Sequence, residues 1–247
     1  MSQSALPLAF GLLAGFANVL GGLAVSGPRR WSERYLKYFI AIGAGFMLAA
    51  AILKMIPESL VEPKHGPQLI LAGYMLVHFF EHSLVPHFHY GEEQHEDQMH
   101  HEHAGRAYTV LVGLMIHTFF DGVSIGAGFA VRPSLGVLLF IAALIHKLPE
   151  GATISSLMLA TGHGRRTAAL SACAIGLATV AGVASISLWS DHQRYGLALA
   201  AGVTIYVAAS DLIPIVNQEK GVRMAFVVFL GVLFFGLTEH ALEAFGL

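Results

Sequence analysis

Residues 116–122 read Ile-His-Thr-Phe-Phe-Asp-Gly, and residues 145–151 read Ile-His-Lys-Leu-Pro-Glu-Gly. In both stretches the histidine and the carboxylate stand four positions apart, which places them one turn apart on the same face of a helix. The two histidines lie 29 residues apart, and so do the two acids. Two helices packed through these faces would bring all four side chains to one point, a site for a divalent transition metal. The predicted ligands are His117, Asp121, His146 and Glu150.

The composition of the chain is that of a membrane protein. Of its 247 residues, 55% are hydrophobic and 12% are charged, whereas soluble proteins average about 25% charged residues. The mean hydropathy is +0.64. A net charge of −2 indicates no basic surface for nucleic acid. The single cysteine, Cys173, excludes an internal disulfide and a thiolate-rich metal site.

Apolar segments long enough to cross a bilayer recur along the whole chain, which predicts an all-α membrane protein with one transmembrane domain over residues 1–247. The first segment is too long for a cleavable signal peptide and lacks its small-residue cleavage site, so we expect it to remain as a span. Eight spans are expected, at about 5–26, 36–57, 67–85, 108–131, 135–160, 166–190, 195–216 and 222–245.

Lysine and arginine are distributed unequally between alternate loops. The first, third, fifth and seventh loops hold nine of them, and the remaining loops hold three. Because positive loops stay in the cytoplasm, both termini are expected on the non-cytoplasmic side. The long third loop, 87–107, would then be cytoplasmic. It carries histidines among acidic residues, and it either binds zinc weakly and reversibly or is a soluble loop without metal. These histidines are His87, His89, His95, His100, His101 and His103.

Spans 1–3 resemble spans 6–8, and span 4 resembles span 5. Pro57 and Pro214 each follow an Ala-Gly pair by the same distance, at an offset of 157 residues. Spans 3 and 8 each carry a Gly followed by a Glu-His pair, at an offset of 158 residues. Copies that lie an odd number of spans apart cross the membrane in opposite directions, so the pattern predicts an inverted-topology repeat, typical of secondary transporters. For spans 1 and 6, the shared composition of glycine-rich membrane helices explains the likeness equally well.

Ionisable groups at the centre of a bilayer cost about 2.5–3.5 kcal/mol each on insertion scales, so four polar groups at that depth need a reason. A bound cation supplies one, since it neutralises the carboxylates and accepts a lone pair from each imidazole. One such His–acid pair could be a helix–helix hydrogen bond, but two pairs in register favour a metal. Imidazole and carboxylate suit zinc, iron and manganese, and the absence of thiolate argues against copper(I).

Lys147 follows one of the predicted ligands and lies about 100° further round the helix. Its ammonium would take the place of a second metal and pair with Asp121 or Glu150, or would turn into an aqueous vestibule. Lys54 and Asp211 occupy matching places in the repeat with opposite charge. They would form an ion pair at a gate or lie near the membrane surface.

Further side chains are candidates for contact with the metal or for lining its pathway. Met47 would offer a thioether to the metal or fill the core. The Glu-His pairs at the ends of spans 3 and 8 would bind the metal where it enters or leaves. These pairs are Glu81 with His82 and Glu239 with His240.

The two motifs resemble those of the ZIP (zinc/iron-regulated transporter-like) family. Residues 117–122 are similar to the His-Asn-x-x-Glu/Asp-Gly of its fourth span, and residues 146–151 to the His-x-x-Pro-Glu-Gly of its fifth. The resemblance covers nearly the whole chain. It implies a 3+2+3 arrangement of the spans, transport of a divalent metal into the cytoplasm and, in many members, a homodimer. It also implies that the four predicted ligands are the primary metal ligands.

Two residues depart from the family pattern. Thr118 stands where many members have Asn, and Lys147 stands where many have Asn, Asp or Glu. In the family these positions help to build a second metal site. The departures therefore argue against a binuclear site. Lysine occurs at this position in one branch of the family, so it does not exclude transport.

The expected function is transport of zinc, with iron, manganese and cadmium as further substrates, by alternating access in a multi-pass protein of a bacterial inner membrane. The rival is an intramembrane zinc hydrolase with Glu150 or Asp121 as the general base. An enzyme would keep one coordination position open and place a further acid–base group beside it. Here both carboxylates are expected to be ligands, which favours the transporter.

Overall fold

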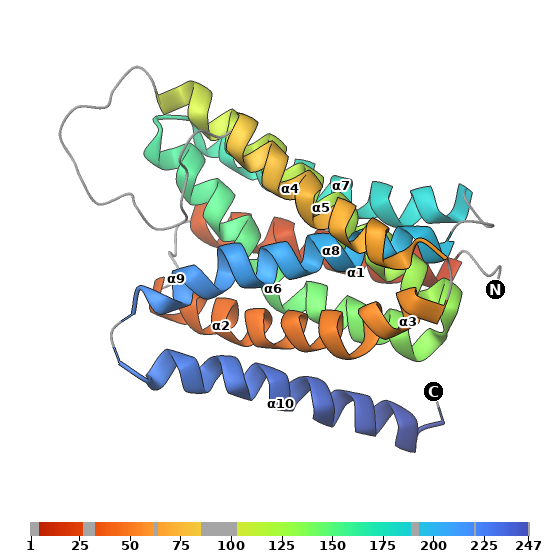
Figure 1. The fold of residues 1–247 in the computed structure, drawn as a ribbon. Helices are drawn as coiled ribbons and strands as arrows, with labels where there is room; N and C mark the ends of the chain where they lie inside the picture. The colour runs from red at the N-terminus through yellow and green to blue at the C-terminus, as the bar shows by residue number, and fades with distance from the viewer. Residues whose placement is uncertain are drawn as a thin grey trace.

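The computed structural model describes residues 5–26, 33–61, 64–84, 103–188, 193–219 and 221–246, and within these ranges it is helical without any strand. The helices lie side by side, and α1 begins at the end of the bundle where α10 ends (Figure 1). The elements are α1 Ala5–Ser26, α2 Glu33–Ala50, η1 Ala51–Met55, α3 Ile56–Val61, α4 Gly66–Leu84, α5 His103–Val131, α6 Pro133–Ala160, α7 Arg165–Leu188, α8 Gln193–Tyr206, η2 Val207–Leu212, α9 Ile213–Asn217 and α10 Arg223–Ala244.

Seven of the described helical segments are long and apolar enough to cross a membrane. The eighth expected span corresponds to α4, which has 19 residues but is less apolar because Gln68, His78, Glu81 and His82 interrupt it. Each expected span therefore coincides with a helical segment. The seven segments are Ala5–Ser26, Tyr35–Val61, Ala107–Val131, Pro133–Ala160, Arg165–Ile186, Gln193–Asn217 and Arg223–Ala244.

Two of the spans contain a π-helical segment immediately before a proline. In η1 the chain widens ahead of Pro57, and in η2 it widens ahead of Pro214. Proline lacks an N–H and its ring collides with the carbonyl four residues earlier, so the normal hydrogen-bond ladder cannot continue there. The residue before each proline instead donates its N–H five residues back, Ile56 to Ala51 and Ile213 to Ala208.

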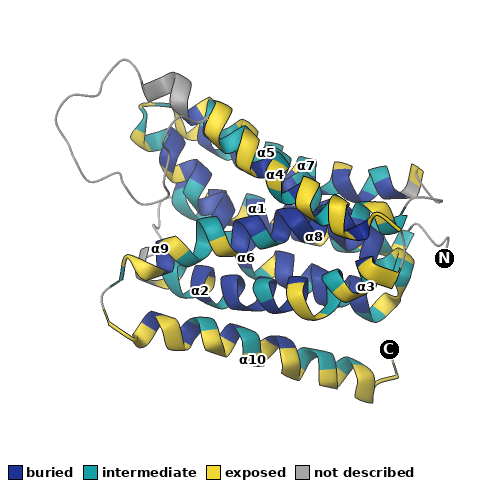
Figure 2. Ribbon diagram, in the orientation of Figure 1, coloured by how far each residue is buried: buried dark blue, intermediate teal, exposed yellow. Residues whose placement is uncertain are grey.

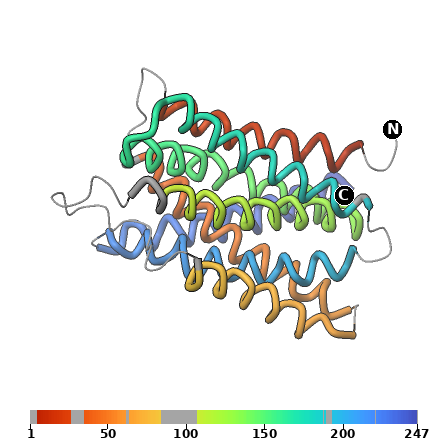
Figure 3. The backbone as a smooth tube through the Cα atoms, turned by 90° about the horizontal axis from the view of Figure 1, so that it is seen from above, coloured from red at the N-terminus to blue at the C-terminus, as the bar shows by residue number. Residues whose placement is uncertain are grey.

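The helices form two groups that meet along α5 and α6. In one group α1 packs on α6 and α7, and α7 packs on α5; in the other, α2 packs on α10 and α4 packs on α8. The groups are joined where α2 contacts α6 and where α8 contacts α5. Figure 3 shows α1 and α7 on one side of the α5–α6 pair and α4 on the other. Buried residues concentrate in the central helices, whereas α10 is largely exposed on its outer face (Figure 2).

Glycines allow the backbones of neighbouring helices to approach one another very closely. A Cβ atom on Gly21 of α1 would overlap the carbonyl of Leu148 in α6, and one on Gly182 of α7 would overlap the carbonyl of Phe119 in α5. Small residues at such crossings are the usual basis of close packing between membrane helices, because lipid provides no hydrophobic force to drive them together. These contacts hold α5 and α6, which carry the predicted ligands, against α7 and α1.

The contact of α8 with α4 depends on Gly202 in the same way, because a Cβ there would overlap the carbonyl of Ile70. We expect Gly202→Ala to destabilise the protein by about 1–3 kcal/mol, since the helices would have to separate. The thermal unfolding midpoint of the purified protein in detergent measures this. Gly236→Ala is the matched control, because nothing lies within 4 Å of the added carbon. Equal midpoints for the two variants would contradict the close-packing account.

Candidate metal site

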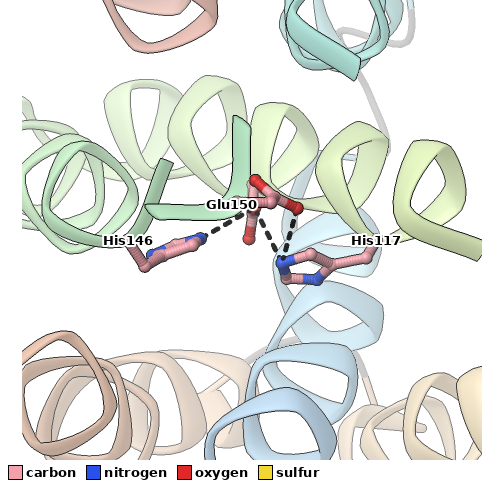
Figure 4. Close-up of side chains that lie close together, drawn as sticks. His117, His146 and Glu150 are labelled. Atoms are coloured by element: carbon pink, nitrogen blue, oxygen red, sulfur yellow. Dashed lines mark hydrogen bonds and ion pairs between the residues drawn. The ribbon is translucent and has the colours of Figure 1, made fainter. Parts of the chain in front are cut away.

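The structure brings the four predicted ligands together. One ligand atom from each of His117, Asp121, His146 and Glu150 can be chosen so that all four atoms lie within 4.8 Å of one another, and all four residues are buried. Helix α5 supplies the first two and α6 the last two, each pair one helical turn apart. Figure 4 shows His117 and His146 on either side of Glu150, with their rings turned toward it. Four imidazole and carboxylate donors at this separation can surround one divalent ion.

The two imidazoles share the carboxylate of Asp121. Nε2 of His117 and Nε2 of His146 each lie 3.2 Å from Oδ2 of Asp121. The other ring nitrogen of His146, Nδ1, lies 2.7 Å from the carbonyl of Ala142 and donates to it. A proton on Nδ1 leaves the lone pair on Nε2 free, and such a second hydrogen bond is what usually orients a metal-binding histidine.

Glu150 presents one oxygen to this cluster. Its Oε1 lies 3.7 Å from Nε2 of His117 and, like Nδ1 of that ring, has no hydrogen-bond partner among the described residues. A buried carboxylate oxygen without a partner is costly. A cation held between the imidazoles and Oε1 would remove that cost.

Lys147 is buried in the cluster and pairs with both acids. Its Nζ lies 2.5 Å from Oδ2 of Asp121 and 3.0 Å from Oε2 of Glu150, and the residue has no exposed surface. The vestibule alternative for this side chain is therefore wrong. Thr118 is also fully buried, but its hydroxyl donates to the carbonyl of Met115 in its own helix.

A cavity of about 570 Å³ extends from the cluster to the end of the bundle where α4 and α9 end. His117, His146 and Glu150 line its inner part. Of the further candidates, Glu81, His82 and Asp211 line the cavity, as do His78, Tyr74, Tyr206 and Ser210. The hydroxyl of Tyr206 donates to Oε2 of Glu81 at 2.8 Å. Oxygen and nitrogen donors thus lie along the route from the cluster to this end, among apolar side chains such as Ile40, Val110 and Leu114.

On the opposite side of the cluster the interior is closed. The space there is about 10 Å³, and Met47 lines it together with Met55, Leu139 and two of the predicted ligands, Asp121 and His146. Met47 is 1% exposed and belongs to the hydrophobic core. It lies beside the cluster, as the thioether hypothesis requires, and also fills the core.

One further expectation is corrected by the structure, and others are not tested by it. Lys54 forms its ion pair with Glu239 of α10, not with Asp211. Glu239 and the exposed His240 do not line the cavity. Most histidines of the long loop lie outside the described residues, namely His87, His89, His95, His100 and His101. His103 begins α5, but its side chain is likewise outside the described part.

The polar side chains near the cluster and its cavity that sequence reasoning overlooked include Asn18, His78 and Tyr206. Asn18 could have been found from the sequence, because a polar residue in the middle of an apolar span indicates a buried polar contact. His78 lies one turn before His82 and stacks against it, with ring centroids 4.1 Å apart. Tyr206 gives no such signal, because a tyrosine in a membrane helix is common and its partner Glu81 is 125 residues away.

An all-helical bundle with several membrane-length apolar helices and a buried His–carboxylate cluster defines a multi-pass membrane protein built around polar residues. The model of the ZIP zinc transporter family matches residues 81–239. This is more than half of the chain, which therefore belongs to that family. The family assignment and the seven apolar helices together establish an integral, multi-pass membrane protein.

Individual relatives differ in how much of their length the chain covers. The chain is 30% identical to zinc transporter ZIP4 of Homo sapiens over 119 residues, which are 47% of this chain and 18% of that protein. It is 32% identical to metal cation symporter ZIP14 of Xenopus tropicalis over 133 residues, 50% of this chain and 28% of that protein. Zinc transporter ZupT of Escherichia fergusonii is 26% identical over 255 residues, and the match covers 98% of both chains.

The pairing of Lys147 with two carboxylates predicts how removal of the ammonium acts. In Lys147→Met, Asp121 and Glu150 would lose their only lysine or arginine partner among the described residues, which costs about 3–5 kcal/mol for a buried pair. We expect a lower unfolding midpoint in chelator and partial recovery with zinc, since the ion replaces the lost charge. Thermal unfolding with and without zinc measures this. Lys64→Met, at an exposed position, is the control, and an unchanged midpoint for Lys147→Met would contradict the expectation.

Proposed function

We propose that this protein transports a divalent transition metal across a membrane, and that zinc is its main substrate. The observation that carries the proposal is the buried set of four ligand atoms within 4.8 Å at the inner end of a donor-lined cavity. The relatives ZIP4 and ZupT are named zinc transporters, and ZIP14 is named a metal cation symporter. Iron, manganese and cadmium are further substrates that the same donor set accepts.

The mechanism we propose is alternating access at this site. The cavity connects the cluster with one end of the bundle, while the side toward the other end is closed by core side chains such as Met47 and Leu139. The closed end also carries an ion pair between the two helix groups, from Arg132 Nη2 to Oε1 of Glu58 at 2.9 Å. Movement of one group along the other, at the contacts of α2 with α6 and α8 with α5, would expose the same ligands to the opposite side.

The 3+2+3 inverted repeat is part of the proposal, and the glycine contacts support it. Gly21 meets the carbonyl of Leu148, and Gly182 meets that of Phe119. The two glycines lie 161 residues apart, and the two carbonyls lie 29 residues apart, as the two motifs do. Gly45 of α2 meets Val228 of α10, and Gly202 of α8 meets Ile70 of α4, at the offsets of 157 and 158 residues. Gly15 and Gly176, also 161 residues apart, meet one another. Such pairing is expected when two halves are related by a pseudo-two-fold axis.

The direction of transport and the kind of membrane are further parts of the proposal. With nine lysines and arginines in the odd loops, the cavity would open to the cytoplasm and both termini would lie outside. Metal released from the cavity would meet the histidine-rich loop 87–107, which we propose accepts it weakly. A ZupT relative in Escherichia fergusonii favours a bacterial inner membrane. The homodimer implied by the resemblance stays a prediction.

The hydrolase alternative is not supported by the comparisons, because the family consists of transporters. The cluster also offers no spare base. Asp121 contacts both imidazoles and Lys147, and Glu150 contacts Lys147 through Oε2 and faces the cluster with Oε1. In the proposed site the remaining oxygen, Oε1 of Glu150, is a metal ligand, so it does not activate a water as a general base would.

The site assignment predicts loss of transport in His117→Ala/Glu150→Ala. We expect saturable zinc uptake into proteoliposomes that hold a zinc-sensitive dye and carry the purified protein, and none with the double variant. The matched control is His163→Ala/Glu243→Ala, which removes the same residue types outside the cluster and should keep uptake. Normal uptake by the site variant would move the pathway elsewhere. Absence of uptake by the unmodified protein, with zinc still bound, would favour an enzyme.

Lys147 predicts a single metal per site. Because its ammonium lies between two carboxylates that would otherwise face a second ion, the protein should bind one zinc per chain in the cluster, and Lys147→Asn should bind up to two. Native mass spectrometry of the purified protein, titrated with zinc, counts the bound ions. His117→Ala/Glu150→Ala separates binding at the cluster from binding by the histidine-rich loop. If Lys147→Asn left both stoichiometry and uptake unchanged, the role of the ammonium as a substitute metal would be wrong.

A further inference from the structure

Asn18 reaches the cluster from a third helix. It lies in the middle of α1 with no exposed surface. Its own carbonyl is so close to α6 that a Cβ atom on Gly151 would overlap it. At this short separation the carboxamide of Asn18 enters the space between Lys147 and Glu150. A polar side chain at such depth in a membrane helix needs partners.

The partners of Asn18 are both acceptors on α6, which identifies the end of the carboxamide that faces them as the nitrogen. That nitrogen donates to the backbone carbonyl of Lys147 at 2.5 Å and to Oε2 of Glu150 at 3.2 Å. The two oxygens of Glu150 are therefore in different environments. Oε2 accepts from Asn18 and from Lys147 Nζ, at 3.0 Å for the latter, while Oε1 has no hydrogen-bond partner among the described residues and faces His117.

We propose that Asn18 is a positioning residue of the metal site, which holds Oε2 of Glu150 so that Oε1 alone is presented to the ion. The inference rests on the proposed function, because it assumes that the cluster binds the metal. Its physical basis is that a carboxylate rotates easily about its terminal bond unless one oxygen is fixed by donors. Such donors to ligating carboxylates typically change metal affinity 10- to 100-fold when they are removed.

Asp121, the other acid of the cluster, is oriented in a different way. Thr179 of α7 lies against Gly122 as Asn18 lies against Gly151, and it is equally buried. Its hydroxyl, however, donates to the carbonyl of Ile175 in its own helix at 3.3 Å. Asp121 is oriented by His146 and Lys147 instead. Thr179 thus provides a control that matches Asn18 in depth and packing, while its hydroxyl is hydrogen-bonded within its own helix.

Asn18→Leu, which keeps the size of the side chain and removes the donor, tests the inference by isothermal titration of the purified protein with zinc. We expect the affinity of the cluster to fall about 10- to 100-fold, whereas Thr179→Val should keep it within about twofold. Asn18→Ser, too short to reach Glu150, should behave as Asn18→Leu and serves if the leucine variant does not fold. Binding that disappears in His117→Ala/Glu150→Ala defines the cluster.

A second comparison separates positioning from a structural role. In Glu150→Gln the ligand that Asn18 orients is altered, so adding Asn18→Leu should cost little further affinity. An equal loss in both backgrounds would overturn the inference, because Asn18 would then act on the fold and not through Glu150. Unchanged affinity in a folded Asn18→Leu protein would overturn it as well, and would leave the proposed function intact. No zinc binding by the unmodified protein would overturn both.

Discussion

Two carboxylates and one ammonium are buried together in the middle of the bundle, and the rest of the site depends on this balance of charge. Asp121 and Glu150 are nearly inaccessible, and Lys147 is completely so. With neutral imidazoles the cluster keeps one net negative charge, which is unfavourable away from water. A single divalent ion reverses the sign of that charge, and a second ion would be repelled. In the proposed site, the residues that would attract a metal would therefore also limit how many can bind.

The charge cluster could not form without the glycines that bring the helices together. Gly122 and Gly151 directly follow the two acids, and each faces a backbone carbonyl of a neighbouring helix. A side chain at residue 122 would push α7 away from α5. A side chain at residue 151 would push α1 away from α6 and would withdraw Asn18 from Glu150. The His–acid–Gly motif thus combines two requirements in one helical turn: the acid faces the site, and the glycine closes the helices around it. This explains why both copies of the motif carry the glycine.

The helical segments and the convergence of the four predicted ligands could be predicted because they depend on local patterns. The span boundaries follow from hydropathy, and the pairing of each histidine with an acid follows from the helical period. What could not be predicted depends on how separate helices cross. The partner of Lys54 is Glu239, 185 residues away, and no periodicity along α2 indicates it. The contact of Asn18 with Glu150 depends likewise on the register of α1 against α6, which the glycine contacts determine.

The two proposed halves have the same backbone contacts, but at one matched position they carry side chains of opposite charge. This difference accompanies the difference between the closed end of the bundle and the end with the cavity. Lys54 in one half corresponds to Asp211 in the other, and Glu239 corresponds to Glu81. Near the closed end, the first pair is an ion pair of unlike charges. In the cavity, the corresponding residues, Glu81 and Asp211, are both acids. Two carboxylates repel one another and cannot form an ion pair, so they favour water or a cation between them. In the proposed alternating access, the Lys54–Glu239 ion pair would therefore favour the arrangement in which that end is closed and the end with the cavity is open.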